Sequence, residues 1–170
     1  MQTISKVEAA RRQLDVAIQL YFQDGDEVAI HTLAAAAFEL VTSLRVHAGE
    51  PDDLLEQIIP ERRAEFLRMW RRPQNFFKHA DRDPSASLEF DPGLTEVTLF
   101  LAVLRFGSLA KRTLPMVTLQ VWFSMHNVDV LLDSEMRTVL GVAGQRWQGM
   151  SRPEFWNLTN RAGRDMPLFR

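Results

Sequence analysis

Hydrophobic positions recur every three or four residues along almost the whole chain, which is the period of an amphipathic α-helix. Ser5 stands where a helix N-cap is expected, and the Gln-Asp-Gly-Asp sequence at 23–26 interrupts the pattern. Between them, one stripe collects five apolar side chains: Val7, Leu14, Ala17, Ile18 and Tyr21. The sequence therefore predicts a first helix over residues 5–22.

The next periodic segment predicts a second helix that is capped by Asp26 and ends near Ala48, before Gly49. Its alanines at 34–37 suit close contact with another helix. A third helix is predicted after Pro51, with an interruption at Pro60, and it continues to residue 70.

Pro73 is expected to begin a separate short helix that carries residues 75–80, because proline is favoured in the first turn of a helix. Residues 81–91 predict the longest loop in the middle of the chain. The segment from Pro92 to about Leu109 is apolar on nearly every side, which places it at the centre of a bundle.

Leu114 and Pro115 begin a further helix. Shorter helical segments are predicted over residues 134–139 and near residues 152–158. The core candidates after residue 114 are Met116, Leu119, Trp122, Phe123 and Val130. With no strand pattern, internal repeat or linker, the prediction is an all-α, single-domain helical bundle of residues 1–170. Its core spans about residues 5–132, and a C-terminal helical extension covers about 134–170.

Composition narrows the class of protein. The chain has 170 residues, 46% of them hydrophobic, which is enough to bury a core. It has no cysteine, so disulfides, zinc fingers and thiol nucleophiles are excluded. The amino terminus lacks the apolar segment of a secretory signal, and the most apolar run, residues 97–104, is too short to span a bilayer. We expect a cytoplasmic protein without membrane contact.

Charge is unevenly distributed around a formal net charge of −2. Residues 24–57 hold eight acids and one base, Arg45. Residues 62–82 reverse the balance, with two acids, Glu65 and Asp81, and seven bases: Arg62, Arg63, Arg68, Arg71, Arg72, Lys78 and Arg82. Such asymmetry can mark an anion-binding face. The pI of about 6.1, which is far below that of a dedicated nucleic-acid binder, favours instead a contact between acidic and basic segments, within the chain or across a dimer interface.

Several catalytic and cofactor motifs are absent from the sequence. It contains no Gly-rich phosphate loop, no HExxH, no calcium loop and no GxSxG elbow. His126, Asp129 and Asp133 have the spacing of metal ligands, but they lack a fourth ligand. His31 and His47 have ordinary structural roles within a helix, and the aromatic residues of the tail, Trp147, Trp156 and Phe169, anchor it to the bundle or stack on bases. No metal and no cofactor are predicted.

Residues 71–84 gather the groups most able to do chemistry. On a helix, Asn75 and His79 share one face, and an apolar face beside it would put the imidazole at the edge of the core, where it could move protons. Arg71 and Arg72 could hold a phosphate. In the alternative interpretation, His79 and Asp81 cap the helix end and Asp83 begins a turn. The candidate binding residues are Arg71, Arg72, Lys78, His79, Asp81 and Asp83.

The stretch from Arg72 to His79 (Arg-Pro-Gln-Asn-Phe-Phe-Lys-His) resembles the R-x(4–6)-H motif of HEPN domains. The resemblance covers at most residues 5 to about 132. Asn75 keeps the three-residue gap to His79 of the family's RNxxxH form, but Gln74 stands in the place of the arginine. The resemblance implies an up-and-down helical core, a homodimer that pairs two motifs in a cleft and, in active members, metal-independent RNA cleavage.

The function predicted from the sequence is a non-catalytic, dimeric binding or interaction protein. Its anion- or nucleotide-binding patch would lie around Arg71–Asp83, and its partner would be RNA or another phosphate-bearing ligand. The alternative is a metal-independent endoribonuclease with Arg72, Asn75 and His79 as catalytic residues.

Overall fold

The computed structural model describes residues 1–50, 63–79, 81, 83–127, 144–145, 147 and 149–165. This part contains helices and no strand, as the all-α prediction requires. The helices are α1 (Lys6–Phe22), α2 (Glu27–His47), α4 (Arg63–Lys78), α5 (Gly93–Leu109), α6 (Leu114–His126) and α8 (Arg152–Asp165). The predicted segments at 51–62 and 134–139, and the core candidate Val130, lie outside the described residues.

Side-chain caps explain where several helices begin. The Oγ of Ser5 accepts the N–H of Glu8 at 3.1 Å, and the carboxylate of Asp26 accepts the N–H of Ala29 at 2.8 Å. Thr113 caps α6 through the N–H of Met116 at 3.5 Å. The boundaries of α1 and α2 predicted from Ser5 and Asp26 are therefore confirmed to within about one residue.

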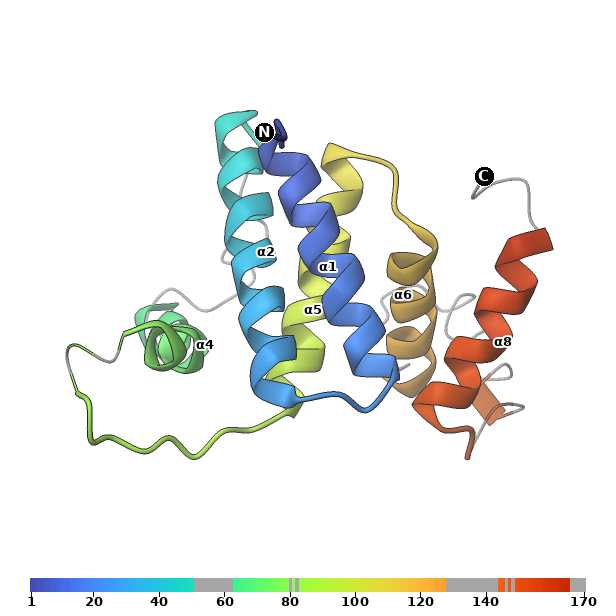
Figure 1. Cartoon of the computed structure of the whole chain (residues 1–170). Coiled ribbons are helices and arrows are strands. Elements are labelled where there is room, and N and C mark those ends of the chain that lie inside the picture. The colour runs from blue at the N-terminus through green and yellow to red at the C-terminus, as the bar shows by residue number, and fades with distance from the viewer. Residues whose placement is uncertain are drawn as a thin grey trace.

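Three long helices, α1, α2 and α5, stand side by side, with α6 next to them (Figure 1). Small side chains with no exposed surface allow close packing: Ala10, Ala17, Ala34, Ala37 and Ala102. The larger side chains of the core are aliphatic or aromatic: Leu14, Ile18, Phe22, Ile30, Val41, Leu99, Phe106, Met116 and Leu119. The alanine run of α2 thus forms the predicted close contact.

α5 is central, as its composition predicted. Every residue of α5 except Gly93 and Ser108 is buried or half-buried. Phe100 stacks on Phe123 of α6, with ring centroids 3.9 Å apart. The chain therefore covers the apolar sides of α5 by itself. This helix leaves no apolar face that a second copy would have to cover.

By length and apolar composition, α2 could cross a membrane, a test that the core helix of a soluble protein also passes. In the bundle, α2 packs against α1, α4 and α5 and contributes six buried residues: Ile30, His31, Ala34, Ala35, Ala37 and Val41.

α8 extends to Asp165, seven residues beyond the predicted end, and packs on α1 and α6. Ser151 and Glu154 form a reciprocal cap at its start. Phe155 is buried, and the indole of Trp156 stacks on Phe22 with centroids 5.4 Å apart. Trp147 packs on Phe155 at 5.9 Å, so both described tryptophans of the tail anchor it to the bundle, while Phe169 lies outside the described residues.

The prediction of a separate short helix that begins at Pro73 was wrong. The sequence indicated a break between Trp70 and a new helix at Pro73, yet α4 runs without interruption from Arg63 to Lys78 with Pro73 inside it. Proline disfavours a helix interior because it has no N–H and its ring crowds the preceding turn. Here Trp70 and Pro73 are both buried. Packing against the bundle therefore outweighs the local preference for a break.

Candidate functional site

α4 lies at one end of the molecule, where it crosses α2 (Figure 1). Its inner side consists of Trp70, Pro73, Gln74 and Phe77, which are buried or half-buried. Trp70 meets Phe38 of α2 with ring centroids 5.8 Å apart, and Phe77 meets His31 of α2 at 6.0 Å. These contacts fix the rotation of α4 and decide which side chains point outward.

The outer side of α4 carries a polar stripe. Arg68, Arg72, Asn75 and His79 are spaced four, three and four residues apart, so they share one face of the helix, and all are exposed. The backbone N–H of His79 still donates to the carbonyl of Asn75 at 3.1 Å, which continues the helical pattern. The continuity through Pro73 is what brings Arg72 into line with Asn75 and His79.

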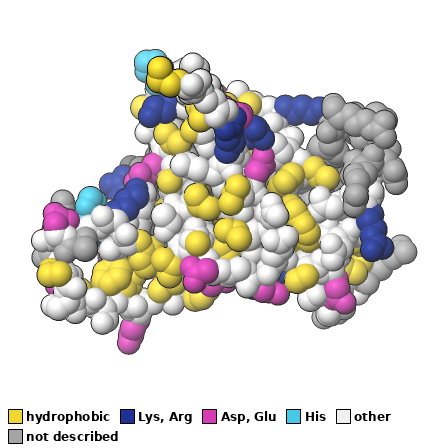
Figure 2. All heavy atoms as spheres, viewed as in Figure 1, with side chains coloured by type: hydrophobic (Ala, Val, Ile, Leu, Met, Phe, Trp, Pro, Cys, Tyr) yellow, Lys and Arg dark blue, Asp and Glu magenta, His cyan; other side chains and the backbone are white. Residues whose placement is uncertain are grey.

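Arg71 and Lys78 lie beside this stripe and are also exposed. We call the six residues Arg68, Arg71, Arg72, Asn75, Lys78 and His79 the basic face. Figure 2 shows basic and histidine side chains near one another at the end of the molecule that holds α4, with hydrophobic side chains beside them.

Two members of the basic face have acidic neighbours. The Nζ of Lys78 lies 3.5 Å from a carboxylate oxygen of Glu39, and the Nδ1 of His79 lies 3.8 Å from Asp81. Within the described part of the chain, Arg68, Arg71 and Arg72 have no carboxylate partner. These three guanidinium groups are therefore available to an external anion.

The predicted site residues separate into two groups. Arg71, Arg72, Asn75, Lys78 and His79 come together on one helix, and Asp81 stays beside His79. Asp83 is exposed, and its carbonyl accepts the N–H of Ala86 at 3.1 Å, as the alternative interpretation of a turn predicted. In the described residues no contact joins Asp83 to the basic face.

The predicted surroundings of His79 were wrong. The sequence placed its imidazole at the edge of the core, but 44% of the side chain is exposed. Phe76 is likewise exposed, whereas Gln74 is buried. The error follows from the predicted break at Pro73, since a helix that began there could take any rotation, while the continuous helix is oriented by Trp70.

A cavity of about 400 Å³ adjoins the basic face. It lies between α4, the extended residues 88–91 and the first turns of α5. Arg72 belongs both to this cavity and to the basic face. The other lining residues are Met69, Trp70, Pro73, Leu88, Glu89, Asp91, Gly93, Leu94 and Val97. Periodicity gave no sign of this cavity, because it depends on a loop that packs beside a helix.

His31 is the most unusual buried group beneath α4. Its side chain is 1% exposed, and its Nδ1 lies 3.1 Å from the Oγ1 of Thr95 on α5. The rings of Phe77 and Phe90 meet the imidazole edge to face, and its Nε2 has no hydrogen-bond partner among the described residues. Burial lowers the pKa of His31 to about 4, so this histidine is neutral and structural, as predicted.

No metal site is formed by the residues that the structure describes. The Nδ1 of His126 lies 2.8 Å from the carbonyl oxygen of Trp122, and the other two candidate ligands, Asp129 and Asp133, are outside the described residues.

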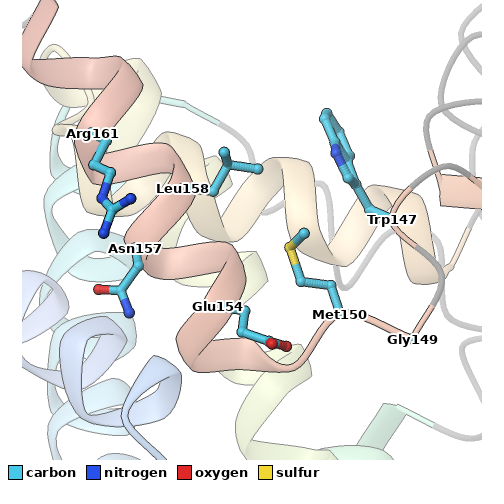
Figure 3. Close-up of a pocket in the computed structure, with 7 residues that line it drawn as sticks. All are labelled: Trp147, Gly149, Met150, Glu154, Asn157, Leu158 and Arg161. Atoms are coloured by element: carbon cyan, nitrogen blue, oxygen red, sulfur yellow. The ribbon is translucent and has the colours of Figure 1, made fainter.

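A second cavity of about 580 Å³ lies along α8 (Figure 3). Glu154, Asn157, Leu158 and Arg161 come from the helix, and Trp147, Gly149 and Met150 from the segment before it. The Glu154 carboxylate is engaged by the N–H and hydroxyl of Ser151, at 2.8 and 2.6 Å. This cavity therefore offers mainly Asn157 and Arg161 for polar contacts with a ligand.

Comparison of the chain with protein-family models, curated proteins and solved structures finds no match.

Proposed function

We propose that this protein is a non-catalytic, dimeric binding protein whose basic face on α4 holds the phosphates of single-stranded RNA. The observation that carries the proposal is the presence of three exposed arginines, Arg68, Arg71 and Arg72, on the outer side of one helix without carboxylate partners in the described residues. Guanidinium groups bind phosphate oxygens in pairs of charge-assisted hydrogen bonds.

The low net charge of the chain does not oppose this proposal. The charge is local: the sequence of α4 contains five bases, Arg63, Arg68, Arg71, Arg72 and Lys78, against the single acid Glu65. Attraction of exposed charges decays over about 10 Å at ordinary ionic strength, so a strand on α4 responds to this helix more than to distant acids. We expect modest affinity with a strong dependence on salt.

The test is a titration of labelled single-stranded RNA by fluorescence anisotropy over a range of salt concentrations. Replacing Arg71 and Arg72 with alanine should weaken binding and reduce the slope of log K against log salt by about 1.4, because two phosphate contacts disappear. A matched control replaces Lys6 and Arg12 with alanine on α1, which α2 separates from α4 (Figure 1). Equal effects of the two double variants would contradict a site on α4.

One observation favours a second candidate, the HEPN-type endoribonuclease. Arg72, Asn75 and His79 share a face of α4, so a phosphate on Arg72 would lie along the same stripe as a proton-carrying imidazole. If wild-type protein cleaves RNA without metal, His79→Ala should lower the rate by roughly 10²- to 10⁴-fold, a far larger effect than on RNA affinity, which the arginines of the basic face still support. A wild type that binds RNA without cleaving it would support the non-catalytic proposal.

A further inference from the structure

The cavity beside the basic face has a volume and apolar walls that binding of phosphate alone does not require. Its volume of about 400 Å³ suits a small ring system. Leu88, Leu94 and Val97 give it apolar walls, with Met69 at its edge. Met69 is 56% exposed, and a thioether makes favourable contacts with aromatic rings.

The two acidic side chains that line the cavity differ in whether they already have a hydrogen-bond partner. One carboxylate oxygen of Asp91 accepts the N–H of Gly93 at 2.9 Å, which holds this carboxylate against the first residue of α5. Glu89 is exposed and lines the cavity, and no described residue forms an ion pair or a hydrogen bond with it. Glu89 therefore offers acceptor oxygens at a cavity whose walls include apolar side chains, while Arg72 offers donors toward the basic face.

We propose that this cavity receives an unpaired nucleobase of the bound strand and that Glu89 selects adenine over hypoxanthine and cytosine over uracil through the amino group that distinguishes each pair. A strand whose phosphates lie on Arg68 and Arg72 brings its bases beside the cavity. An amino group of adenine or cytosine donates to the Glu89 carboxylate, whereas hypoxanthine and uracil present a carbonyl oxygen at the same position, which the carboxylate repels. This inference rests on the proposed function.

The experiment compares the affinities of equally long single strands of adenine, hypoxanthine, cytosine and uracil nucleotides, together with an abasic strand. The adenine strand should bind about tenfold more tightly than the hypoxanthine strand, and the cytosine strand more tightly than the uracil strand, because one good base contact is worth about this much. In Glu89→Ala both differences should disappear.

Glu65→Ala is the matched control, because it removes one exposed acid from α4 outside the cavity. Both variants should bind the abasic strand somewhat more tightly than wild type, but only Glu89→Ala should lose the preference for amino-bearing bases. An amino preference that persists in Glu89→Ala would overturn the role of Glu89.

The two proposals fail in different ways. If the abasic strand binds as tightly as the adenine strand, and that binding is lost when Arg71 and Arg72 are replaced, the cavity proposal is wrong while phosphate binding stands. If no strand binds at moderate salt, the proposed function itself is wrong, and the cavity proposal falls with it.

Discussion

His31 is an imidazole inside the bundle with half of its hydrogen-bonding capacity used. Thr95 satisfies one ring nitrogen, and aromatic rings from α4 and the segment before α5 enclose the other side. No charged group contributes to its shift in pKa, which burial alone causes. At a pH between 4 and 6.5, His31 is therefore neutral in the folded protein and protonated in the unfolded chain.

This difference predicts a loss of stability in acid. Between pH 6.5 and about 4, the unfolded state binds the His31 proton and the folded state does not. Above pH 6.5 the state of His31 costs the folded protein no stability. As the pH falls from 6.5 toward 4, the free energy of unfolding should decline by on the order of 3 kcal/mol because of this histidine. Urea unfolding measured from pH 7 to pH 4 should show this decline.

The double variant His31→Leu with Thr95→Val isolates the effect from other titrating groups. Replacing both partners with apolar side chains should cost little at pH 7, since no buried polar atom loses its partner. Its unfolding free energy should fall by less than that of wild type between pH 6.5 and 4. Parallel pH profiles for the two proteins would contradict the assignment.

At the scale of elements, α4 shows what the sequence could and could not predict. The caps at Ser5 and Asp26 and the breaks at Gly25 and Gly49 are local signals, and they located α1 and α2 well. Pro73 is also a local signal, but the packing of its neighbour Trp70 on α2 opposes it. Helical pattern cannot show which of two such effects is larger.

Replacing Pro73 with alanine tests that balance. Alanine supplies an N–H for the carbonyl of Met69 and favours a helix interior by about 3 kcal/mol. The change also removes about two buried methylene groups, which costs roughly 1.6 kcal/mol. We expect a net gain of about 1 kcal/mol in the free energy of unfolding by urea. Affinity for an abasic strand should stay unchanged, because the basic face keeps its rotation and Pro73 lines the cavity rather than that face. A loss of stability would mean that the ring of Pro73 packs more tightly than its burial indicates.

One arginine adds a polar contact between α8 and the end of α1, beside the aromatic contacts of Phe155 and Trp156 with Phe22. A guanidinium nitrogen of Arg152 lies 2.7 Å from the carboxylate of Asp24, and the group covers the ring of Tyr21 at 4.5 Å. Arg152→Ala should therefore lower the unfolding free energy by about 1 kcal/mol and increase amide exchange in α8. Arg161→Ala, which changes an exposed arginine of the same helix, should do neither. Similar exchange in both variants would show that Phe155 and Trp156 hold the helix without Arg152.

At the scale of the whole molecule, the sequence identified the residues of the basic face but not their surroundings. Arginine, lysine and histidine in one short stretch are visible without a structure. The cavity and the exposure of His79 depend on how α4 crosses α2 and how residues 88–91 return beside it. These contacts join segments far apart in the chain, and helical periodicity carries no information about them.

Pairing of two copies is the remaining prediction about the whole molecule. Since α5 is covered within one chain, pairing must use another surface, and α4 offers two exposed apolar side chains, Met69 and Phe76, at 56% and 38% exposure. They are seven residues apart and therefore share an edge of the helix. A two-fold contact there would bring two basic faces near each other.

Sedimentation at micromolar concentration should give about twice the mass of the 19.6 kDa chain, and Phe76→Ser should shift the protein toward the single chain. Leu158→Ser is the control, because it changes a similarly exposed apolar residue on α8, far from α4 along the bundle (Figure 1). If the wild type sediments as a single chain that still binds RNA through Arg71 and Arg72, one basic face is sufficient for binding. The paired-motif cleft on which the endoribonuclease alternative depends would then be excluded.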